Sequence, residues 1–233
     1  MKTSTLELQA ADGHSLSAYC AQPSDTPRAA LVIVQEVFGV NGHIRNLCER
    51  WAAEGYLAIA PALYDRVARG VELAYGPDGV ARGRDIRTQV SDEIALRDVE
   101  AAVDHAARAL GDGIKVGVVG FCWGGTLAWL AATRLQKVAA AVAYYGTGIA
   151  GYVNEGPLMP VMLHFGAQDA NIPPADVARI RAAHPELPAF IYEAGHGFSC
   201  DDRAAYDAPS AASALERTRA FLAQHLDTGS AGR

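Results

Sequence analysis

The sequence lacks a long hydrophobic run, a signal-like N-terminus and any paired cysteine motif. In its C-terminal half the longest strongly apolar stretch, around residues 138–145, is far shorter than the ~20 residues that a membrane-spanning helix needs. Residues 1–14 alternate polar and apolar side chains, so we expect no secretory signal peptide. These absences favour a cytoplasmic protein that does not interact with membranes.

The four cysteines show neither a Cys-x-x-Cys pair nor a spacing with histidine that is typical of a metal site. They are Cys20, Cys48, Cys122 and Cys200. Without an export signal, we interpret them as free thiols in a reducing compartment. Charges are mixed as well: 20 Lys+Arg and 26 Asp+Glu give a net charge of −6, and no block of five like charges occurs. A nucleic-acid partner is therefore not expected.

Apolar residues make up 50% of the 233 residues, which is enough to build a core. No internal repeat or linker divides the chain, so we predict a single domain over residues 1–226 and a flexible tail over 227–233. Strands are expected at 3–9, 15–20, 29–35, 56–60, 114–119, 138–144, 160–165 and 189–192. Helices are expected at 43–54, 91–110, 124–135, 175–183 and 210–226.

Apolar strands that alternate with amphipathic helices predict an α/β fold, with a mostly parallel sheet and helices on both of its faces. The first two predicted strands flank Asp12-Gly13, a turn signal that predicts an antiparallel N-terminal hairpin. In such sheets ligands bind at the carboxyl ends of the strands. The functional residues are therefore expected in the segments that follow the strands.

The sharpest of these segments is Gly120-Phe121-Cys122-Trp123-Gly124-Gly125, between a predicted strand and a predicted helix. It has the form of the nucleophile elbow G-x-S-x-G, with cysteine in place of serine. The glycines allow strand and helix to approach closely around a strained turn. A helix N-terminus behind the sulfur favours the thiolate. We therefore predict Cys122 as a nucleophile, rather than as a small buried residue in a tight turn.

A nucleophilic thiol needs a base and an acid that orients the base, and in this fold type they follow the nucleophile in that chain order: acid, then histidine. Asp169 follows the strand predicted at 160–165, and His196 follows the strand at 189–192, between two glycines. Both residues are thus expected at carboxyl ends of strands. Taken alone, Asp169 could be a turn or cap residue and His196 a surface histidine, but their joint placement favours a triad with Cys122.

Glu36 and Val37 follow the strand predicted at 29–35, beside the predicted elbow. A carboxylate next to a thiol either takes its proton or keeps it neutral, because like charges disfavour each other. Glu36 could also be a solvated residue at the start of a loop. The backbone N–H groups of Val37 and Trp123 are the expected donors of an oxyanion hole.

The other histidines and cysteines are weaker candidates. We expect His164, inside a predicted strand, to be a packed core group, and Cys20 and Cys48 to be packing residues. Cys200 could line the same cleft as His196. The remaining histidines of helix faces and ends are expected to be solvated; they are His43, His105, His184 and His225.

Together the segments 35–41, 120–125, 144–146, 166–169 and 194–198 resemble those of the dienelactone hydrolases, also called carboxymethylenebutenolidases, in the α/β-hydrolase superfamily. These segments read Q-E-V-F-G-V-N, G-F-C-W-G-G, Y-Y-G, G-x-x-D and A-G-H-x-F. A cysteine at the elbow together with Q-E-x-F-G is specific, since most α/β-hydrolases carry serine and lack that glutamate. The resemblance covers nearly the whole chain and implies an α/β-hydrolase fold.

The resemblance implies a catalytic triad of Cys122, His196 and Asp169. It also implies that Glu36 pairs with the thiol at rest and swings away on substrate binding. The thiolate would attack the carbonyl of an activated lactone, give a thioester and release a product such as maleylacetate. No metal and no organic cofactor are implied, and the partner is a small lactone or ester rather than a macromolecule. The chain is expected as a monomer or small homo-oligomer.

Well-known members of the family bind the substrate carboxylate with two arginines. One precedes the long middle helix, where this chain offers Arg82, Arg84 and Arg87, of which we choose Arg82. The other lies four residues after the catalytic histidine, where this chain has Cys200; the nearest arginine is Arg203. An arginine suits a carboxylate because its planar fork donates two parallel hydrogen bonds. Phe38 and Tyr144, which belong to the matching motifs, are further candidates for contacting the substrate.

Two alternatives stay open at the level of the sequence. The chain could hydrolyse a broader range of small carboxylic esters with the same triad. It could also be a non-catalytic protein of this fold whose Cys122 senses oxidants. For either hydrolase we expect the rate to fall on acidification, as His196 becomes protonated.

Overall fold

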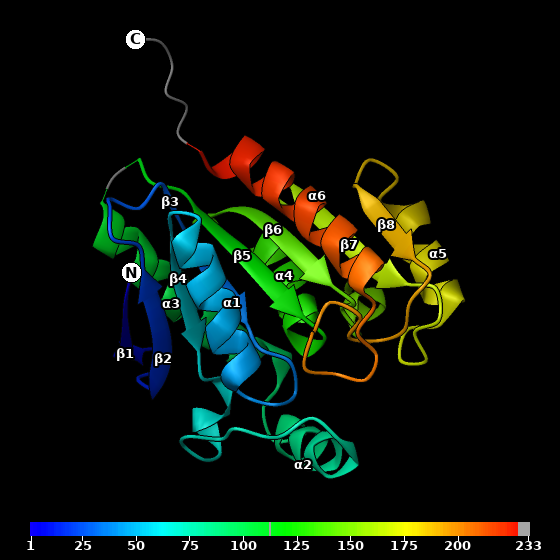
Figure 1. The fold of residues 1–233 in the computed structure, drawn as a ribbon, viewed down its shortest axis with the longest axis horizontal. Coiled ribbons are helices and arrows are strands. Elements are labelled where there is room, and N and C mark those ends of the chain that lie inside the picture. Colours follow the sequence, from blue (N-terminus) through cyan, green and yellow to red (C-terminus); the bar gives the residue numbers. More distant parts are fainter. Residues whose placement is uncertain (112, 228–233) are drawn as a thin grey trace.

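Residues 1–111 and 113–227, which the computed structural model describes, fold around an eight-stranded sheet with the order β1-β2-β4-β3-β5-β6-β7-β8 (Figure 1). The strands are β1 (Lys2–Gln9), β2 (Ser15–Gln22), β3 (Ala29–Val34), β4 (Tyr56–Pro61), β5 (Val116–Phe121), β6 (Val138–Tyr144), β7 (Val161–Gly166) and β8 (Ala189–Tyr192). β2 pairs antiparallel with β1 and β4, and the neighbours from β4 to β8 are parallel. The predicted mostly parallel sheet with an N-terminal hairpin is confirmed.

Helices cover both faces of this sheet, as predicted. The helices are α1 (Gly42–Ala53), α2 (Pro77–Arg87), α3 (Asp92–Leu110), α4 (Trp123–Arg134), α5 (Pro174–Ala183) and α6 (Ala208–Leu226), with short 3-10 turns η1 (Leu63–Arg66) and η2 (Ile149–Tyr152). α1 and α6 contact one face, and α3 and α4 contact the other. Every residue of β3, β4, β5 and β7 is consequently buried or nearly so, which explains why these strands are apolar without alternation.

Local signals place most element ends well. The Ser91 hydroxyl accepts a hydrogen bond from the Ile94 N–H at 3.3 Å and caps α3, as its position in the sequence predicts. β5 lies two residues later than expected, at 116–121 instead of 114–119. The strand therefore runs directly into Cys122, with no loop between the sheet and the elbow.

α2 is a helix that the sequence analysis does not predict. Its glycines and many exposed polar residues weaken the helical pattern, and only Gly83 and Ile86 are buried. It lies beyond the carboxyl ends of the strands, at the bottom of Figure 1. A Cβ atom built on Gly83 would lie 1.9 Å from the Val37 carbonyl oxygen. The glycine is thus required because the backbone of α2 contacts the backbone of the loop after β3.

Asp227, at the start of the predicted tail, caps the C-terminus of α6 and pairs with Arg28, whose Nε lies 2.8 Å from Asp227 Oδ1. The rest of that predicted tail, 228–233, lies outside the described residues. Among the residues that the structure describes, no helix combines the length and the apolar character needed to cross a membrane.

The contact between α2 and the loop after β3 predicts the sign of a stability change. Helix propensity alone would make Gly83→Ala stabilising by about 1 kcal/mol. We expect the opposite, a destabilisation of about 1–3 kcal/mol, because the methyl group overlaps the Val37 carbonyl. Thermal unfolding measures the difference. Gly42→Ala in α1 is the matched control, since nothing lies within 4 Å of its Cβ position; equal melting temperatures for both variants would refute the close approach.

Candidate active site

Four loops meet at one edge of the sheet, after the strands β3, β5, β7 and β8. They carry Glu36 with Val37, then Cys122, Asp169 and His196, in that order. Parallel strands bring their carboxyl ends to the same edge, which explains how residues more than 150 positions apart become neighbours. All candidates of the predicted triad are therefore on one side of the molecule, the side of α2 (Figure 1).

Cys122 occupies a strained turn between β5 and α4. Its backbone angles are φ 57° and ψ −117°, in a region that residues with side chains rarely adopt. A Cβ atom on Gly120 would lie 1.8 Å from the Gly124 carbonyl oxygen, and one on Gly124 would lie 2.3 Å from that of Val34. These two glycines are needed because strand, turn and helix approach each other with their backbones. The geometry is that of the predicted nucleophile elbow.

Asp169 and His196 form the pair that the sequence predicts. His196 Nδ1 lies 2.7 Å from Asp169 Oδ2, and the other carboxylate oxygen accepts a hydrogen bond from the Asn171 N–H at 2.8 Å. The Asp169 side chain is fully buried and the His196 ring is nearly so. The Tyr145 ring contacts His196 edge-on, with 5.0 Å between the ring centroids. The imidazole is therefore held in one orientation, with its Nε2 side available to the elbow.

The charge state of His196 depends on Cys122. Burial lowers the pKa of the imidazole, but hydrogen bonds to Asp169 and Cys122, together with their negative charges, raise it to about 10. With such a pKa the imidazole is already protonated at neutral pH. The decline of the rate on acidification, which is expected from the sequence, stays a prediction.

Glu36 is buried beside the site but does not pair with the thiol. Among the described residues its carboxylate accepts hydrogen bonds from Arg203 Nη1 at 2.9 Å and from the Tyr75 hydroxyl at 3.2 Å. The resting pair between Glu36 and Cys122, implied by the family resemblance, is thus not seen. The physical reason is charge: the positively charged guanidinium of Arg203 attracts the carboxylate, and a sulfur atom does not.

A cavity of about 420 Å³ opens next to these groups. Six of the predicted site residues line it: Val37, Phe38, Cys122, Trp123, His196 and Arg203. Trp123 is the first residue of α4, so its backbone N–H has no acceptor within the helix. Val37, in the loop after β3, and Trp123, at the start of α4, both line the cavity, so their N–H groups stay the predicted donors of an oxyanion hole.

Arg82, our choice for binding a substrate carboxylate, does not line the cavity. It lies on the exposed side of α2 and pairs with Asp85 at 2.7 Å. The turn of the helix instead presents Arg84 and Arg87 to the cavity, so the choice of Arg82 is wrong. Had residues 77–87 been predicted as a helix, Arg82 and Arg84 would have been assigned to different faces, because residues two positions apart point to different sides of a helix.

The two arginines of α2 at the cavity differ in their partners. Arg87 pairs with Asp92, and its guanidinium carbon lies 4.6 Å from the centroid of the Trp123 ring. Arg84 donates to Asn171 Oδ1 at 3.2 Å, and within the described part of the chain no carboxylate pairs with it. Asp92 and Asn171 also line the cavity, and the sequence analysis missed both.

Tyr144, the other predicted contact residue, does not line the cavity. It is buried, and its hydroxyl lies 2.6 Å from Oγ1 of Thr218 in α6. His164 lies in the same network, as a packed core group, and burial lowers its pKa to about 3. Cys200 is also fully buried and does not line the cavity; burial, and then the charge of Glu36, raises the pKa of its thiol to about 12.

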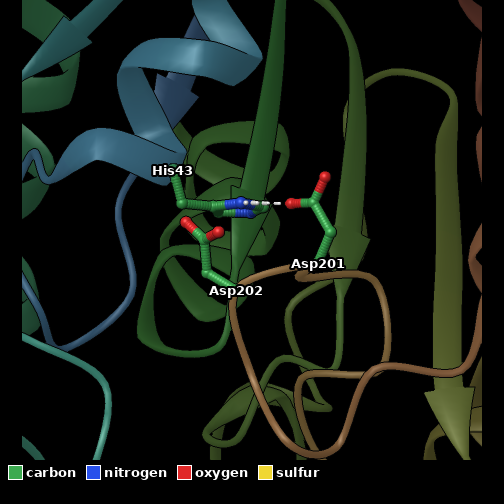
Figure 2. A group of neighbouring side chains, drawn as sticks. All are labelled: His43, Asp201 and Asp202. Atoms are coloured by element: carbon green, nitrogen blue, oxygen red, sulfur yellow. Dashed lines mark hydrogen bonds and ion pairs between the residues drawn. The ribbon is translucent and has the colours of Figure 1, made fainter.

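In the described residues, His43, Asp201 and Asp202 form a group whose ligand atoms lie within 4.8 Å of one another (Figure 2). His43 is buried rather than solvated, contrary to expectation, and its Nδ1 lies 3.2 Å from Asp201 Oδ1. The second oxygen of Asp201 accepts from Arg50 at 2.7 Å. Histidine and carboxylates could ligate a divalent ion. The existing partners of Asp201 instead make this cluster an anchor between α1 and the loop that follows His196.

Comparison with known sequences gives one family over most of the chain. The sequence model of the Dienelactone hydrolase family matches residues 16–226. A carboxymethylenebutenolidase from Pseudomonas putida is 36% identical over 230 residues, which cover 96% of this chain and 97% of that protein. A protein from Synechocystis, provisionally named a carboxymethylenebutenolidase, is 38% identical over 91% of this chain and 92% of its own length.

Comparison with solved structures agrees. A crystal structure of a protein from Klebsiella pneumoniae, provisionally assigned as a dienelactone hydrolase, has a TM-score of 0.82. It is 35% identical and covers 97% of this chain and 100% of that chain. An esterase from Pyrococcus furiosus, at 15% identity and a TM-score of 0.70, shares the fold alone.

The pair of Asp169 and His196 predicts an unusual titration. We expect NMR to show the His196 imidazole protonated up to pH about 10. Cys122→Ser should lower that midpoint by about 1–3 pH units, because a hydroxyl does not supply the charge interaction with Cys122 that helps to raise the pKa of His196. The pKa of His196 in the folded protein exceeds its ordinary value of 6.5. The pair with Asp169 therefore stabilises the fold fully below pH 6.5, and this stabilisation is lost as the pH rises through about 10.

His164 is the internal control for this titration. Its ring should stay neutral down to pH about 3 in both proteins, because burial alone sets its pKa. An ordinary midpoint near 6.5 for His196 in the unsubstituted protein would contradict the coupling.

Proposed function

The chain belongs to the dienelactone hydrolase family, and from that premise we propose that it opens activated lactones through a cysteine thioester. It is a hydrolase of carboxylic esters or lactones. The observation that carries the cysteine mechanism is the His196–Asp169 pair at 2.7 Å, which faces the same cavity as Cys122 on its strained turn. Family membership and this ordered pair favour catalysis over a non-catalytic, oxidant-sensing role.

In the first proposed step the Cys122 sulfur adds to the lactone carbonyl carbon. The electron pair of the C=O bond moves to oxygen, and the backbone N–H groups of Val37 and Trp123 bind the resulting oxyanion. Collapse of this adduct breaks the ring C–O bond and expels an enolate, leaving an acyl thioester on the sulfur. The enolate takes the proton of the His196 imidazolium, which leaves the imidazole neutral for the next step. An enolate is a good leaving group. An activated enol ester is therefore a better substrate for a thiolate nucleophile than an amide is.

In the second step water cleaves the thioester. His196 accepts a proton from the water as it attacks, and Asp169 holds the imidazole in place and balances its positive charge. The sulfur leaves as thiolate and returns to its pair with the imidazolium. Glu36, held by Arg203 and Tyr75, takes no proton in this cycle.

The cavity favours a substrate with one carboxylate. Three arginines line it, but Arg203 is paired with Glu36 and Arg87 with Asp92. Arg84 is therefore the cation whose charge a substrate carboxylate would meet, with the amide of Asn171 beside it. In the proposed dienelactone hydrolase, Arg84 thus takes the role of binding the substrate carboxylate that the sequence analysis gave to Arg82.

Broader ester hydrolysis is the second candidate, and the same charge pairing favours it. The pairing of Arg203 with Glu36 leaves one arginine rather than two for an anionic substrate. Part of the cavity lining is apolar, including Phe38 and Val80, and would accept small neutral esters as well. We also propose a cytoplasmic location, in line with four free thiols.

Substitution of the nucleophile tests the cysteine mechanism. We expect Cys122→Ala to abolish turnover, and Cys122→Ser to lower kcat at least about 100-fold, because a hydroxyl is not ionised by the imidazole. Mass spectrometry of the unsubstituted protein mixed with an aryl ester should show one acyl group on Cys122, which then disappears. Cys48→Ala, at a buried packing position, is the control. Unchanged turnover in Cys122→Ala would refute the mechanism.

Substitution of the arginines of α2 separates the two candidate substrates. Arg84→Gln should raise the KM for cis- or trans-dienelactone about tenfold, the effect of one lost hydrogen bond to a charged group. The KM for neutral 4-nitrophenyl acetate should not change, and Arg82→Gln should change neither, because that side chain faces away from the cavity. Negligible lactone turnover beside ready aryl-ester cleavage would establish the broader esterase instead.

A further inference from the structure

Both peptide groups that flank Val37 are held by side chains. The Glu36 carbonyl accepts a hydrogen bond from Gln35 Nε2 at 3.3 Å, and the Val37 carbonyl accepts one from the Tyr64 hydroxyl at 3.1 Å. In a trans peptide the C=O and N–H groups point in opposite directions. Holding the Glu36 carbonyl therefore sets the direction of the Val37 N–H, and holding the Val37 carbonyl fixes the next peptide plane.

The start of η1 supplies both supports. The Leu63 N–H donates to Gln35 Oε1 at 3.2 Å and so orients the amide that holds Glu36. The Tyr64 hydroxyl also lies 3.0 Å from the Gly83 carbonyl oxygen. Its single proton can serve Gly83 and Val37 only as a shared, three-centre hydrogen bond. Burial raises the pKa of Tyr64, so the phenol keeps this proton and remains a donor.

The ring of Tyr64 supports the other half of the oxyanion hole. It stacks on the indole of Trp123, with 5.8 Å between the centroids and 21° between the planes. The guanidinium carbon of Arg87 lies 4.6 Å from the centroid of that indole, and Asp92 accepts a hydrogen bond from the indole Nε1 at 2.8 Å. The residue that carries the second N–H donor is thus held by contacts with its ring and by a hydrogen bond at its edge.

We propose that Tyr64 is a positioning residue of the oxyanion hole, which aligns the Val37 and Trp123 N–H groups from one buried side chain. The inference rests on the proposed function. Tyr64 does not line the cavity, so it acts through these two residues and not on the substrate. Its effect is confined to steps in which negative charge develops on a carbonyl oxygen, because only those steps need both donors aimed at one point.

Tyr64→Phe tests the proposal, because it removes the hydroxyl and keeps the stacked ring. With 4-nitrophenyl acetate we expect kcat to fall about tenfold or more and KM to stay within about twofold. The affinity for an aryl trifluoromethyl ketone, which adds to the sulfur and forms an oxyanion, should fall in parallel. Alkylation of Cys122 by iodoacetamide should keep its rate and pH profile, because sulfur displaces iodide there without forming an oxyanion.

Tyr192→Phe is the matched control. It also removes a hydrogen-bonded phenol hydroxyl, one that lies 2.9 Å from both His164 and Arg217, away from the cavity. We expect it to lower the melting temperature and leave kcat unchanged. Should Tyr64→Phe fold poorly, Gln35→Leu serves in its place, because it frees the Glu36 carbonyl. It must likewise lower kcat for ester hydrolysis and leave the alkylation rate of Cys122 unchanged.

The outcomes separate this inference from the function on which it rests. A kcat that Tyr64→Phe leaves unchanged, or a loss of hydrolysis matched by an equal loss of alkylation, overturns the positioning role while hydrolysis by the unsubstituted protein stands. Absence of ester and lactone hydrolysis in the unsubstituted protein overturns both.

Discussion

The site depends on one backbone constraint, the left-handed turn at Cys122. A residue with a side chain adopts φ 57° only where the surroundings hold it there, and here β5 and α4 do so by direct contact between their backbones. The turn places the sulfur at the cavity and leaves the first N–H of α4 without an intrahelical partner. Nucleophile and oxyanion donor are therefore consequences of the same local geometry.

Around this turn, the charged side chains are matched in pairs, two of which join segments far apart in the chain. Asp169 holds His196, Glu36 holds Arg203, and Asp92 holds Arg87. A buried charge is costly without a partner, so each pair also fixes the position of the loop that carries it. Among the described residues that line the cavity, Arg84 is the arginine without a carboxylate partner. Its positive charge is therefore available to attract an anionic substrate.

Much of the framework was predictable because its signals are local. Buried strands such as β3 are continuous apolar runs, Ser91 has the form of a helix cap, and the glycines around Cys122 leave few other conformations. Helix α2, which the sequence did not predict, shows the limit of such signals. Its glycines read as helix breakers, yet the close approach of Gly83 to Val37 requires one of them, and a contact of that kind has no signature in the helix itself.

The errors at the site concern which side chains face each other. The choice of Arg82 missed which face of α2 meets the cavity, and the pairing of Glu36 with the thiol missed the contact with Arg203 from a distant segment. The sequence by itself determined the chain order of nucleophile, acid and histidine, and their places after strands, because strand periodicity and turn chemistry are encoded residue by residue. Only the tertiary structure decided which arginines reach the cavity and which carboxylate each one meets, since this depends on how α2 packs against the loop after β3 and, for Arg203 and Glu36, on residues far apart in the chain.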